Sequence, residues 1–407
     1  MTHIYDVIIV GSGPGGLMAA VAAEKRKLSY LVIDKNAIAG KKLLITGASR
    51  CNVTNPFDVR IFIEKLSLKH KRFLYSTLSS FGTNEVKQFI ETNGVELVLE
   101  NDLKYFPKSS KSIDILNVFL RNINLNNIRY NQKVIKIQKQ NDFIVTTDKN
   151  EYYSKNVILA TGSRSFPITG STGEGVSFAK KFGHTIYPFY PAETHVYSNQ
   201  IKEQSNLIQG ISFKNVLVKL KGTKIKEQGD ILFTHFGLSG PVIQSLSEHI
   251  YHQIISDNSA VVMINISSMS INELRQFFAS ENEHTILQVL DMILPKRFSR
   301  YFMTQFSISN GRVKDVNDKH LEKIIEQLVE YKVLIQKVED VSKAYVNGGG
   351  VSTKEINPKT MESKNVSGLY FVGEMIDVHG PIGGFNITIA MSTGYTAANS
   401  INMIQKK

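Results

Sequence analysis

The chain has 407 residues, of which 42% are hydrophobic and 21% charged, with no tryptophan and one cysteine. This length suffices for two or three packed units, and a single cysteine excludes an internal disulfide and dithiol redox chemistry within one chain. No apolar run reaches the roughly 18–20 residues of a membrane-spanning helix. Because the first residues enter a strand without a basic leader, we expect a cytoplasmic protein with no signal peptide.

The formal net charge is +12 and the isoelectric point is near 9.4. A lysine-rich composition alone can give these values, whereas a polyanionic partner such as RNA would use the lysines and arginines to neutralise phosphates. Basic clusters occur at 69–73, 104–111 and 295–302. In the last cluster basic and aromatic residues alternate, a mixture suited to backbone contacts and base stacking; its members include Arg297, Phe298, Arg300, Tyr301 and Phe302.

The first fifty residues predict a strand, a glycine turn, a helix and a second strand. Residues 5–10, YDVIIV, form the continuous apolar run that is typical of a buried parallel strand. The turn GSGPGG and an alanine-rich helix follow, and residues 29–34 form the second strand, which ends in Asp34. This order is typical of a dinucleotide-binding unit.

The predicted secondary structure changes twice in the middle of the chain. We expect helices within 57–93 and a strand meander over 128–162, with turns at 140–142 and 148–150. Beyond Pro188 and Pro191, residues 195–237 alternate like antiparallel strands. Helical periodicity follows at 271–294 and 318–335.

A glycine-rich pattern like that near the start of the chain occurs again at 344–352, and a predicted strand, a glycine loop and a final helix follow it. We therefore expect an α/β protein whose nucleotide-binding domain is formed by both ends of the chain, 1–190 and 346–407. A β-rich and helical domain would be inserted at 191–345.

Gly11, Gly13 and Gly16 form a G-x-G-x-x-G motif between a predicted strand and a predicted helix. The glycines allow a tight turn, a close approach of the backbone to a pyrophosphate, and close helix–strand packing. The helix N-terminus would present free N–H groups and a positive dipole to the phosphates. Asp34, 18 residues beyond Gly16, is placed to accept hydrogen bonds from ribose hydroxyls.

Three features favour FAD over NAD as the resident dinucleotide. A second strand ends in Ala160–Gly162 after the meander, and Val134 lies early in that meander, where its backbone would meet adenine. The segment 368–374 is similar to one in flavoproteins whose terminal acid, here Glu374 rather than the usual Asp, reaches the ribityl or phosphate region. A helix opening at Gly383–Asn386 would direct its N-terminus toward the flavin ring. The chain has no second G-x-G-x-x-G, so NADH or NADPH would bind only transiently.

Five segments extend this picture: GKKLLITGASRCNVTN, YFPKSSKS, ILFTHFGLSGP, NGGGVSTKEINPKTMESK and GLYFVGEMIDVHGPIGGFN. In these segments, and in order over nearly the full chain, the sequence resembles bacterial flavoproteins described as aminoacetone-oxidase-like or bile-acid-reductase-like FAD enzymes. The resemblance implies a split Rossmann-like FAD domain of the two-dinucleotide flavoprotein type, with an inserted β-barrel-like and helical domain. One departure is that the family usually has TGGGRCN, where this chain has Ala48 and Ser49.

The resemblance also implies reduction of activated C=C bonds, in unsaturated steroid ketones or in uridine of ribosomal RNA, and oxidation of small amines is attributed to the family as well. The residues predicted to contact FAD are Gly11, Gly13, Pro14, Gly15, Gly16, Asp34, Lys35, Lys42, Thr46, Gly47, Arg50, Cys51, Asn52, Val134, Ala160, Thr161, Gly162, Gly373, Glu374, Gly383, Gly384, Phe385 and Asn386.

Reduction of a C=C bond needs a hydride on one carbon, a proton on its neighbour and polarisation of the conjugated carbonyl. Cys51 is a candidate proton donor, and a small packing residue is the alternative reading. His379, before the last helix, and His235, with Ser239 in the inserted domain, are further candidates that a structural role explains equally well. No spacing typical of metal ligands and no nucleophilic serine motif occurs, so we expect no metal.

The sequence therefore predicts a cytoplasmic FAD-dependent oxidoreductase that is reduced by NADH or NADPH. The preferred substrate is a uridine of ribosomal RNA, giving dihydrouridine, because of the basic charge. A small unsaturated ketone is the close alternative, an O₂-dependent oxidase of a small amine such as aminoacetone is a third, and a non-enzymatic FAD-bearing RNA-binding or assembly module is a fourth. Oligomeric state is not fixed by these patterns.

Overall fold

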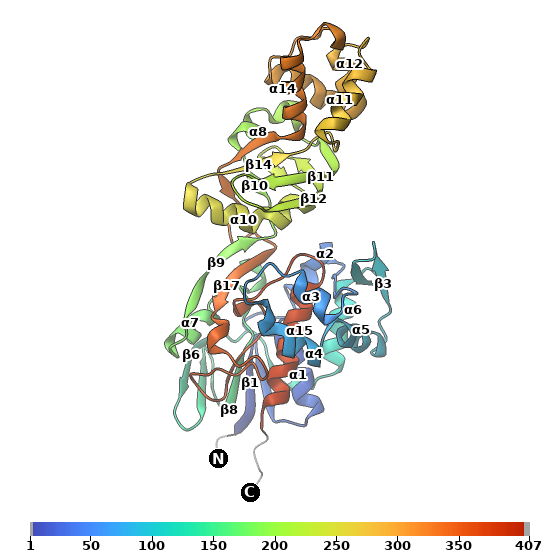
Figure 1. The fold of residues 1–407 in the computed structure, drawn as a ribbon. Helices are drawn as coiled ribbons and strands as arrows, with labels where there is room; N and C mark the ends of the chain where they lie inside the picture. The colour runs from blue at the N-terminus through green and yellow to red at the C-terminus, as the bar shows by residue number, and fades with distance from the viewer. Residues whose placement is uncertain (1–2, 403–407) are drawn as a thin grey trace. The chain divides into compact units, whose positions relative to one another are not determined.

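The computed structural model describes residues 3–402, and these form two compact units (Figure 1). The first unit comprises the described residues up to Tyr190 and from Val341 onward, and the second comprises Pro191–Asp340. Each unit has its own hydrophobic core.

The first unit is built on a seven-stranded sheet with the order β5-β2-β1-β8-β7-β6, in which β18 also pairs with β8. The pairs β1–β2, β1–β8, β2–β5 and β8–β18 are parallel, whereas β6, β7 and β8 form the antiparallel meander that the sequence predicts. Because parallel strands share a carboxyl edge, the segments that follow β1, β2, β8 and β18 meet at one edge of the sheet. The strands are β1 (Ile4–Val10), β2 (Tyr30–Ile33), β5 (Ile128–Arg129), β6 (Val134–Lys139), β7 (Phe143–Thr147), β8 (Glu151–Leu159) and β18 (Leu369–Phe371).

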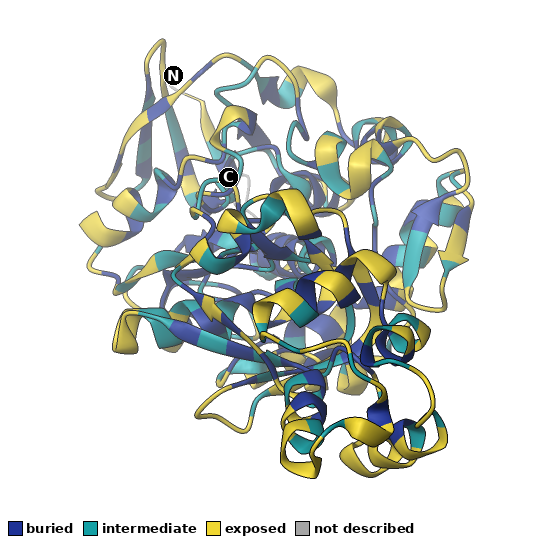
Figure 2. Cartoon of the chain, turned by 90° about the horizontal axis from the view of Figure 1, so that it is seen from above, coloured by how far each residue is buried: buried dark blue, intermediate teal, exposed yellow. Residues whose placement is uncertain are grey.

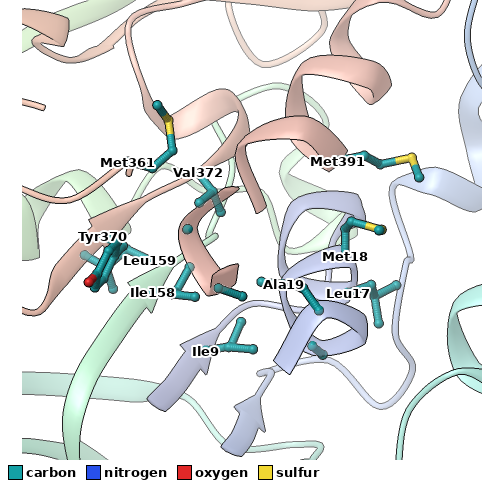
Figure 3. Packing of buried hydrophobic residues seen from close by; sticks show 14 of the residues in the cluster. Ile9, Leu17, Met18, Ala19, Ile158, Leu159, Met361, Tyr370, Val372 and Met391 are labelled. Atoms are coloured by element: carbon teal, nitrogen blue, oxygen red, sulfur yellow. The ribbon is translucent and has the colours of Figure 1, made fainter. Parts of the chain in front are cut away.

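Two helices from opposite ends of the chain pack together against this sheet: α1 (Pro14–Lys25) and α15 (Phe385–Ser400). Figure 3 shows Leu17 and Met18 of α1 with Met391 of α15, beside Ile9 of β1. The helices approach closely because a side chain at Gly394 would place its Cβ 2.0 Å from the Gly15 carbonyl oxygen. The two ends of the chain therefore form one nucleotide-binding fold.

The remaining elements of the first unit surround this core. Helices occur within 57–93, as the sequence predicts. They are α3 (Val59–Glu64), α4 (Tyr75–Ser80) and α5 (Thr83–Thr92); the other elements are α2 (Thr46–Ser49), the hairpin β3 (Leu97–Glu100) and β4 (Lys104–Pro107), α6 (Ser112–Arg121), α7 (Gly175–Lys181), and the pair β9 (Ile186–Ala192) and β17 (Val346–Val351).

The second unit contains a seven-stranded antiparallel sheet with the order β15-β14-β11-β12-β13-β10-β16. Its two edge strands, β15 (Tyr331–Ile335) and β16 (Lys337–Val338), are separated in the chain only by Gln336. The sheet must therefore curl until its edges meet, which makes it barrel-like. The other strands are β10 (Val196–Tyr197), β11 (Ser212–Leu220), β12 (Lys226–Phe233), β13 (Gly237–Ser239) and β14 (Ala260–Ile264).

Two sequence-based expectations for this unit are wrong. Residues 331–335 form strand β15 rather than the end of a helix, because their side chains alternate between buried and exposed. The stretch 199–208, expected to be extended, forms short helices, and Ser198 caps the first of them by accepting a hydrogen bond from the Ile201 N–H. The helices are α8 (Asn199–Glu203), α9 (Ser205–Ile208), α10 (Pro241–Asp257), α11 (Ile271–Ser280), α12 (Ile286–Ile293), α13 (Lys296–Gln305) and α14 (Asp318–Val329).

The basic–aromatic cluster at 295–302 is also not the stacking platform that its composition suggests. It forms the start of α13, and the spacing of Phe298, Tyr301 and Phe302 places all three rings in the core of the second unit. Figure 2 shows other helices with one buried and one exposed face. Among the basic and aromatic residues of this cluster, only the cations are exposed. None of the described helices is long and apolar enough to cross a membrane.

Candidate functional site

A cavity opens in the first unit at the carboxyl edge of β1, β2 and β8, between the starts of α1 and α15. Most of the residues predicted to contact the dinucleotide line it. They are Gly11, Gly13, Pro14, Gly15, Asp34, Lys35, Lys42, Thr46, Val134, Ala160, Thr161, Gly162, Gly373, Glu374 and Asn386.

The glycine turn has the geometry that a pyrophosphate requires. Gly11 has a φ of +104°, which only glycine adopts without strain. A Cβ at Gly16 would lie 1.9 Å from the Gly11 carbonyl oxygen, so this position holds the turn against the helix. Gly13 precedes α1 and has open space where a side chain would stand. The N–H groups in the first turn of α1 have no intrahelical acceptors and are available to an anion.

Asp34 lies directly after β2, where its carboxylate is held by local donors. Ser12 donates from its backbone N–H at 2.7 Å and from its hydroxyl at 2.6 Å to Oδ2. The N–H of Asn36 donates to Oδ1 at 2.8 Å. These contacts orient the carboxylate at the cavity wall, as a ribose acceptor needs. The role of Ser12 was not predicted, because it lies at a variable position of the glycine motif.

Glu374 faces the cavity as half of an ion pair. Its Oε2 lies 2.6 Å from Nζ of Lys42 and accepts a hydrogen bond from Ser163 at 2.9 Å, and Lys42 also donates to Ser165. Burial raises the pKa of Glu374, but the Lys42 charge and the hydrogen bonds from Lys42 and Ser163 outweigh it and hold the pKa below its ordinary value. Glu374 is therefore ionised at neutral pH. Its carboxylate is held by Lys42 and Ser163, which lie 332 and 211 positions away in the chain.

The segment 163–175 forms a wall of the cavity that sequence reasoning missed. Thr169, Gly170, Ser171 and Glu174 line the cavity, and the Thr169 carbonyl oxygen accepts a hydrogen bond from Asn36. Lys35 ties the segment down through Glu174 at 2.7 Å and Thr172 at 2.8 Å. The glycines at 170 and 173, so soon after Ala160–Gly162, were the available signal. Gln132, beside Val134, is a further missed lining residue.

The loop GASRC has an unusual backbone. Gly47, Ala48, Ser49 and Cys51 have φ angles of 56°, 55°, 66° and 63°. Such a conformation costs a residue other than glycine about 1 kcal/mol or more. This accounts for the glycines that the resembling family usually has where this chain has Ala48 and Ser49.

The side chains of Arg50 and Asn52 are used within the protein. Arg50 forms an ion pair with Glu100 and lies over the ring of Phe106. The side-chain amide of Asn52 donates to the carbonyl oxygens of Thr54 and Tyr105, each at 3.1 Å. Neither residue lines the cavity, nor does Gly47. Their geometry supports the loop rather than a direct cofactor contact.

Cys51 lies in the core of the first unit, with no exposed surface, and does not line the cavity. Burial raises the pKa of its thiol to about 12, although a hydrogen bond with Thr46 opposes the shift. A buried thiol that is such a weak acid matches the packing interpretation better than proton donation.

We therefore expect Cys51→Ala to keep bound FAD and product formation within about twofold of the wild type. The lost contacts should lower the free energy of unfolding by about 1 kcal/mol. Flavin absorbance, turnover and thermal denaturation measure the three quantities. A variant that retains FAD but loses turnover by more than tenfold would restore Cys51 as a proton donor.

The start of α15 is tied to the segment after Cys51. Gly384 is the residue before the helix, and Thr54 packs so closely on it that a Cβ there would meet the Thr54 backbone at 2.5 Å. Asn55 donates to the Gly383 carbonyl oxygen at 3.1 Å. Asn386 lines the cavity and exchanges hydrogen bonds with the Gly380 backbone. Four further predicted contact residues do not line the cavity: Gly16, Gly383, Gly384 and Phe385.

The two candidate histidines do not line the cavity. His379 is 2% exposed, and its ring lies edge-on to Tyr190 with centroids 6.0 Å apart. His235 is an exposed residue of the loop between β12 and β13 in the second unit, edge-on to Phe236. The structure therefore places His379, but not His235, within the same unit as the cavity.

These residues fit a dinucleotide such as FAD. Space opens at Gly13, the first turn of α1 supplies free N–H groups, and Asp34 is oriented at the wall. The cavity then runs past Thr161 and Glu374 to the start of α15, as an extended ligand needs.

Comparison with protein families matches residues 5–400 to the family described as HI0933-like protein Rossmann domain. A "Ribosomal RNA dihydrouridine synthase" of Haemophilus influenzae is 26% identical over 99% of this chain and 100% of its own length. A "3-dehydro-bile acid delta(4,6)-reductase" of Clostridium scindens is also 26% identical, over 96% of this chain and 98% of its own length.

Among solved structures, a 3-ketosteroid-Δ4-(5α)-dehydrogenase of Rhodococcus jostii superposes with a TM-score of 0.52 at 12% identity. The match covers 98% of this chain and 97% of the dehydrogenase. At that identity the likeness concerns the fold alone.

Proposed function

Because this chain belongs to the HI0933-like Rossmann family and is an FAD-dependent oxidoreductase, we propose that it reduces an activated C=C bond, with a uridine of ribosomal RNA as substrate and dihydrouridine as product. The observation that carries the proposal is the full-length likeness to a ribosomal RNA dihydrouridine synthase. The net charge of +12 supports a polyanionic substrate.

Bound FAD would supply the hydride, and NADH or NADPH is proposed to supply the electrons to it. The protein's part is to bind and orient. The Gly11–Gly15 turn and the first turn of α1 would hold the pyrophosphate, and Asp34 the ribose. The N-terminus of α15 would favour negative charge at the reactive end of the cavity.

The Lys42–Glu374 pair has a positioning role in this proposal. Its salt bridge joins the segment after β2 to the segment after β18, and both segments line the cavity. Both donors to Glu374, Lys42 and Ser163, bond to Oε2. No other described residue donates to Oε1, and a ribityl hydroxyl is a suitable donor for it. His379 is the retained candidate for the proton that completes the reduction.

Reduction of a small unsaturated ketone is the second candidate. The likeness to the bile-acid reductase is as extensive as the likeness to the RNA enzyme, so identity alone does not separate the two substrates. Neither of the two relatives described above is named as an oxidase of a small amine or as a non-enzymatic RNA-binding protein.

The test is nucleoside mass spectrometry of ribosomal RNA from the source organism and from a deletion strain. We expect the ribosomal RNA of the deletion strain to lack one dihydrouridine, so that one nucleoside has the mass of uridine instead of a mass two units higher. Expression of the protein from a plasmid should restore the dihydrouridine. An unchanged nucleoside profile would remove the RNA substrate. Steady-state turnover of an unsaturated steroid ketone by the purified enzyme would then favour the second candidate.

A further inference from the structure

We propose that RNA docks on the first unit, on a cationic rim formed by Lys65, Lys69, Arg72 and Lys104, and not on the basic face of α13. This inference rests on the proposed function, since it assumes that the substrate is RNA. It assigns the docking surface to one unit and to named residues.

The two units differ in charge. The second unit, Pro191–Asp340, contains 16 lysines and arginines against 17 aspartates and glutamates. The rest of the chain contains 32 against 19, so it carries the whole positive surplus. Because sequence-independent affinity for RNA comes from cations that neutralise phosphates, the surplus favours the first unit as the docking surface.

Within the first unit, the rim borders the loop that leads into α15. Phe62 of α3 packs on Phe385 with ring centroids 4.5 Å apart, and Leu66 packs on Gly380. Figure 1 draws α3 beside α15. Lys65 and its neighbours follow α3 directly, and the side chain of Lys104 lies near Gly383. These contacts place the rim beside the loop that leads into α15.

The rim is also available to an anion. Lys65, Lys69 and Arg72 are exposed, and Lys104 is partly exposed. Among the residues that the structure describes, no carboxylate forms a salt bridge with any of the four, whereas nearby Lys87 and Lys108 pair with Glu91 and Glu96.

A phosphate backbone would supply the counter-charges that these cations lack. Lys65 lies 4.6 Å from the centre of the Phe57 ring, which holds its stem in place on the surface. A small unsaturated ketone, either neutral or with a single carboxylate as in a bile acid, would engage at most one of these cations. The arrangement therefore supports RNA over the small-molecule alternative.

The test compares two triple variants of the full-length holoenzyme: Lys65→Gln, Lys69→Gln and Arg72→Gln on the rim, and Lys296→Gln, Arg300→Gln and Lys319→Gln on the second unit. The two variants remove the same number of exposed positive charges. Binding of a fluorescein-labelled, uridine-containing RNA oligonucleotide is measured by anisotropy from 50 to 300 mM salt. Flavin absorbance checks that each variant is folded and loaded.

The rim variant should bind RNA at least about tenfold more weakly near 100 mM salt. The slope of log K against log salt, which is negative, should become shallower by about 2. The second-unit variant should stay within about twofold of the wild type. Equal binding by the rim variant and the wild type, or a larger loss in the second-unit variant, would overturn the docking surface. If the wild type forms dihydrouridine and the rim variant forms it equally well, only the docking surface fails. If the wild type neither binds RNA nor forms dihydrouridine, the proposed function fails as well.

Discussion

Gly16→Ala is expected to yield protein without bound FAD and with a much lower melting temperature. The added Cβ would lie 1.9 Å from the Gly11 carbonyl oxygen, a backbone atom that has no rotamer to change. Gly11 has no room to retreat, because its own Cα hydrogens face the Ala160 carbonyl, where a Cβ would lie at 2.5 Å. The strain falls on the glycine turn and on the contact between β1 and β8. We expect a loss of more than about 4 kcal/mol in the free energy of unfolding.

Gly13→Ala is the matched control, because it separates packing from cofactor binding. Gly13 has a negative φ and nothing within 4 Å of an added Cβ, but it lines the cavity. The variant should fold like the wild type and bind FAD at least about tenfold more weakly, since the methyl group would stand where the pyrophosphate approaches. The 450 nm to 280 nm absorbance ratio and thermal denaturation measure both effects. A Gly16→Ala protein that is stable and fully loaded would contradict the assignment of the turn.

Lys42→Met is expected to destabilise the protein and weaken FAD binding, although Lys42 is remote in sequence from the glycine motif. The substitution leaves the Glu374 carboxylate partly buried, about 20% exposed, without its cation. The expected cost is about 2 kcal/mol, between the values for exposed and for fully buried ion pairs. The double variant Lys42→Met, Glu374→Gln removes both charges and should recover at least half of that loss. A double variant no better than the single one would show that the pair is not coupled.

The wild type and Lys42→Met should show opposite dependences of stability on pH. In the wild type the pKa of Glu374 is held below its unfolded value of about 4.3, so this group stabilises the fold above that pH and loses its contribution as the pH falls through the folded pKa. Without Lys42, only the Ser163 hydrogen bond and His379 would oppose burial, so the pKa of Glu374 should rise above its unfolded value and stability should fall as the pH rises. Melting temperatures of both proteins between pH 4 and 7 test the sign. Parallel curves would contradict the electrostatic role of Lys42.

Local patterns predicted the nucleotide fold well, because each of its parts is encoded in adjacent residues. The apolar run before Gly11, the helix after it and the acid after β2 are all read from 30 consecutive positions, and the structure has them as expected. Its two-ended assembly follows from the glycine-rich strand and helix near the C-terminus, which pack beside β8 and α1.

The parts that the sequence could not predict depend on contacts between distant residues. The pairing of Lys42 with Glu374 and the wall at 163–175 arise only when separate segments fold together. Burial was the other unknown. The same amphipathic period that makes α13 a helix also turns Phe298 inward, and the thiol of Cys51 lies in the core although its neighbours are loop residues. The identities of charged and aromatic residues alone do not show which of their side chains face solvent.

The most direct test of the central claim is an anaerobic single turnover with the holoenzyme. The bound flavin should be bleached at 450 nm by NADH or NADPH, and ribosomal RNA from the deletion strain should then restore the absorbance while one uridine in it gains two mass units. RNA from the wild-type strain, already modified, should leave the flavin reduced. A flavin that no nicotinamide bleaches, or that only O₂ reoxidises, would contradict reduction of a C=C bond in RNA by this protein.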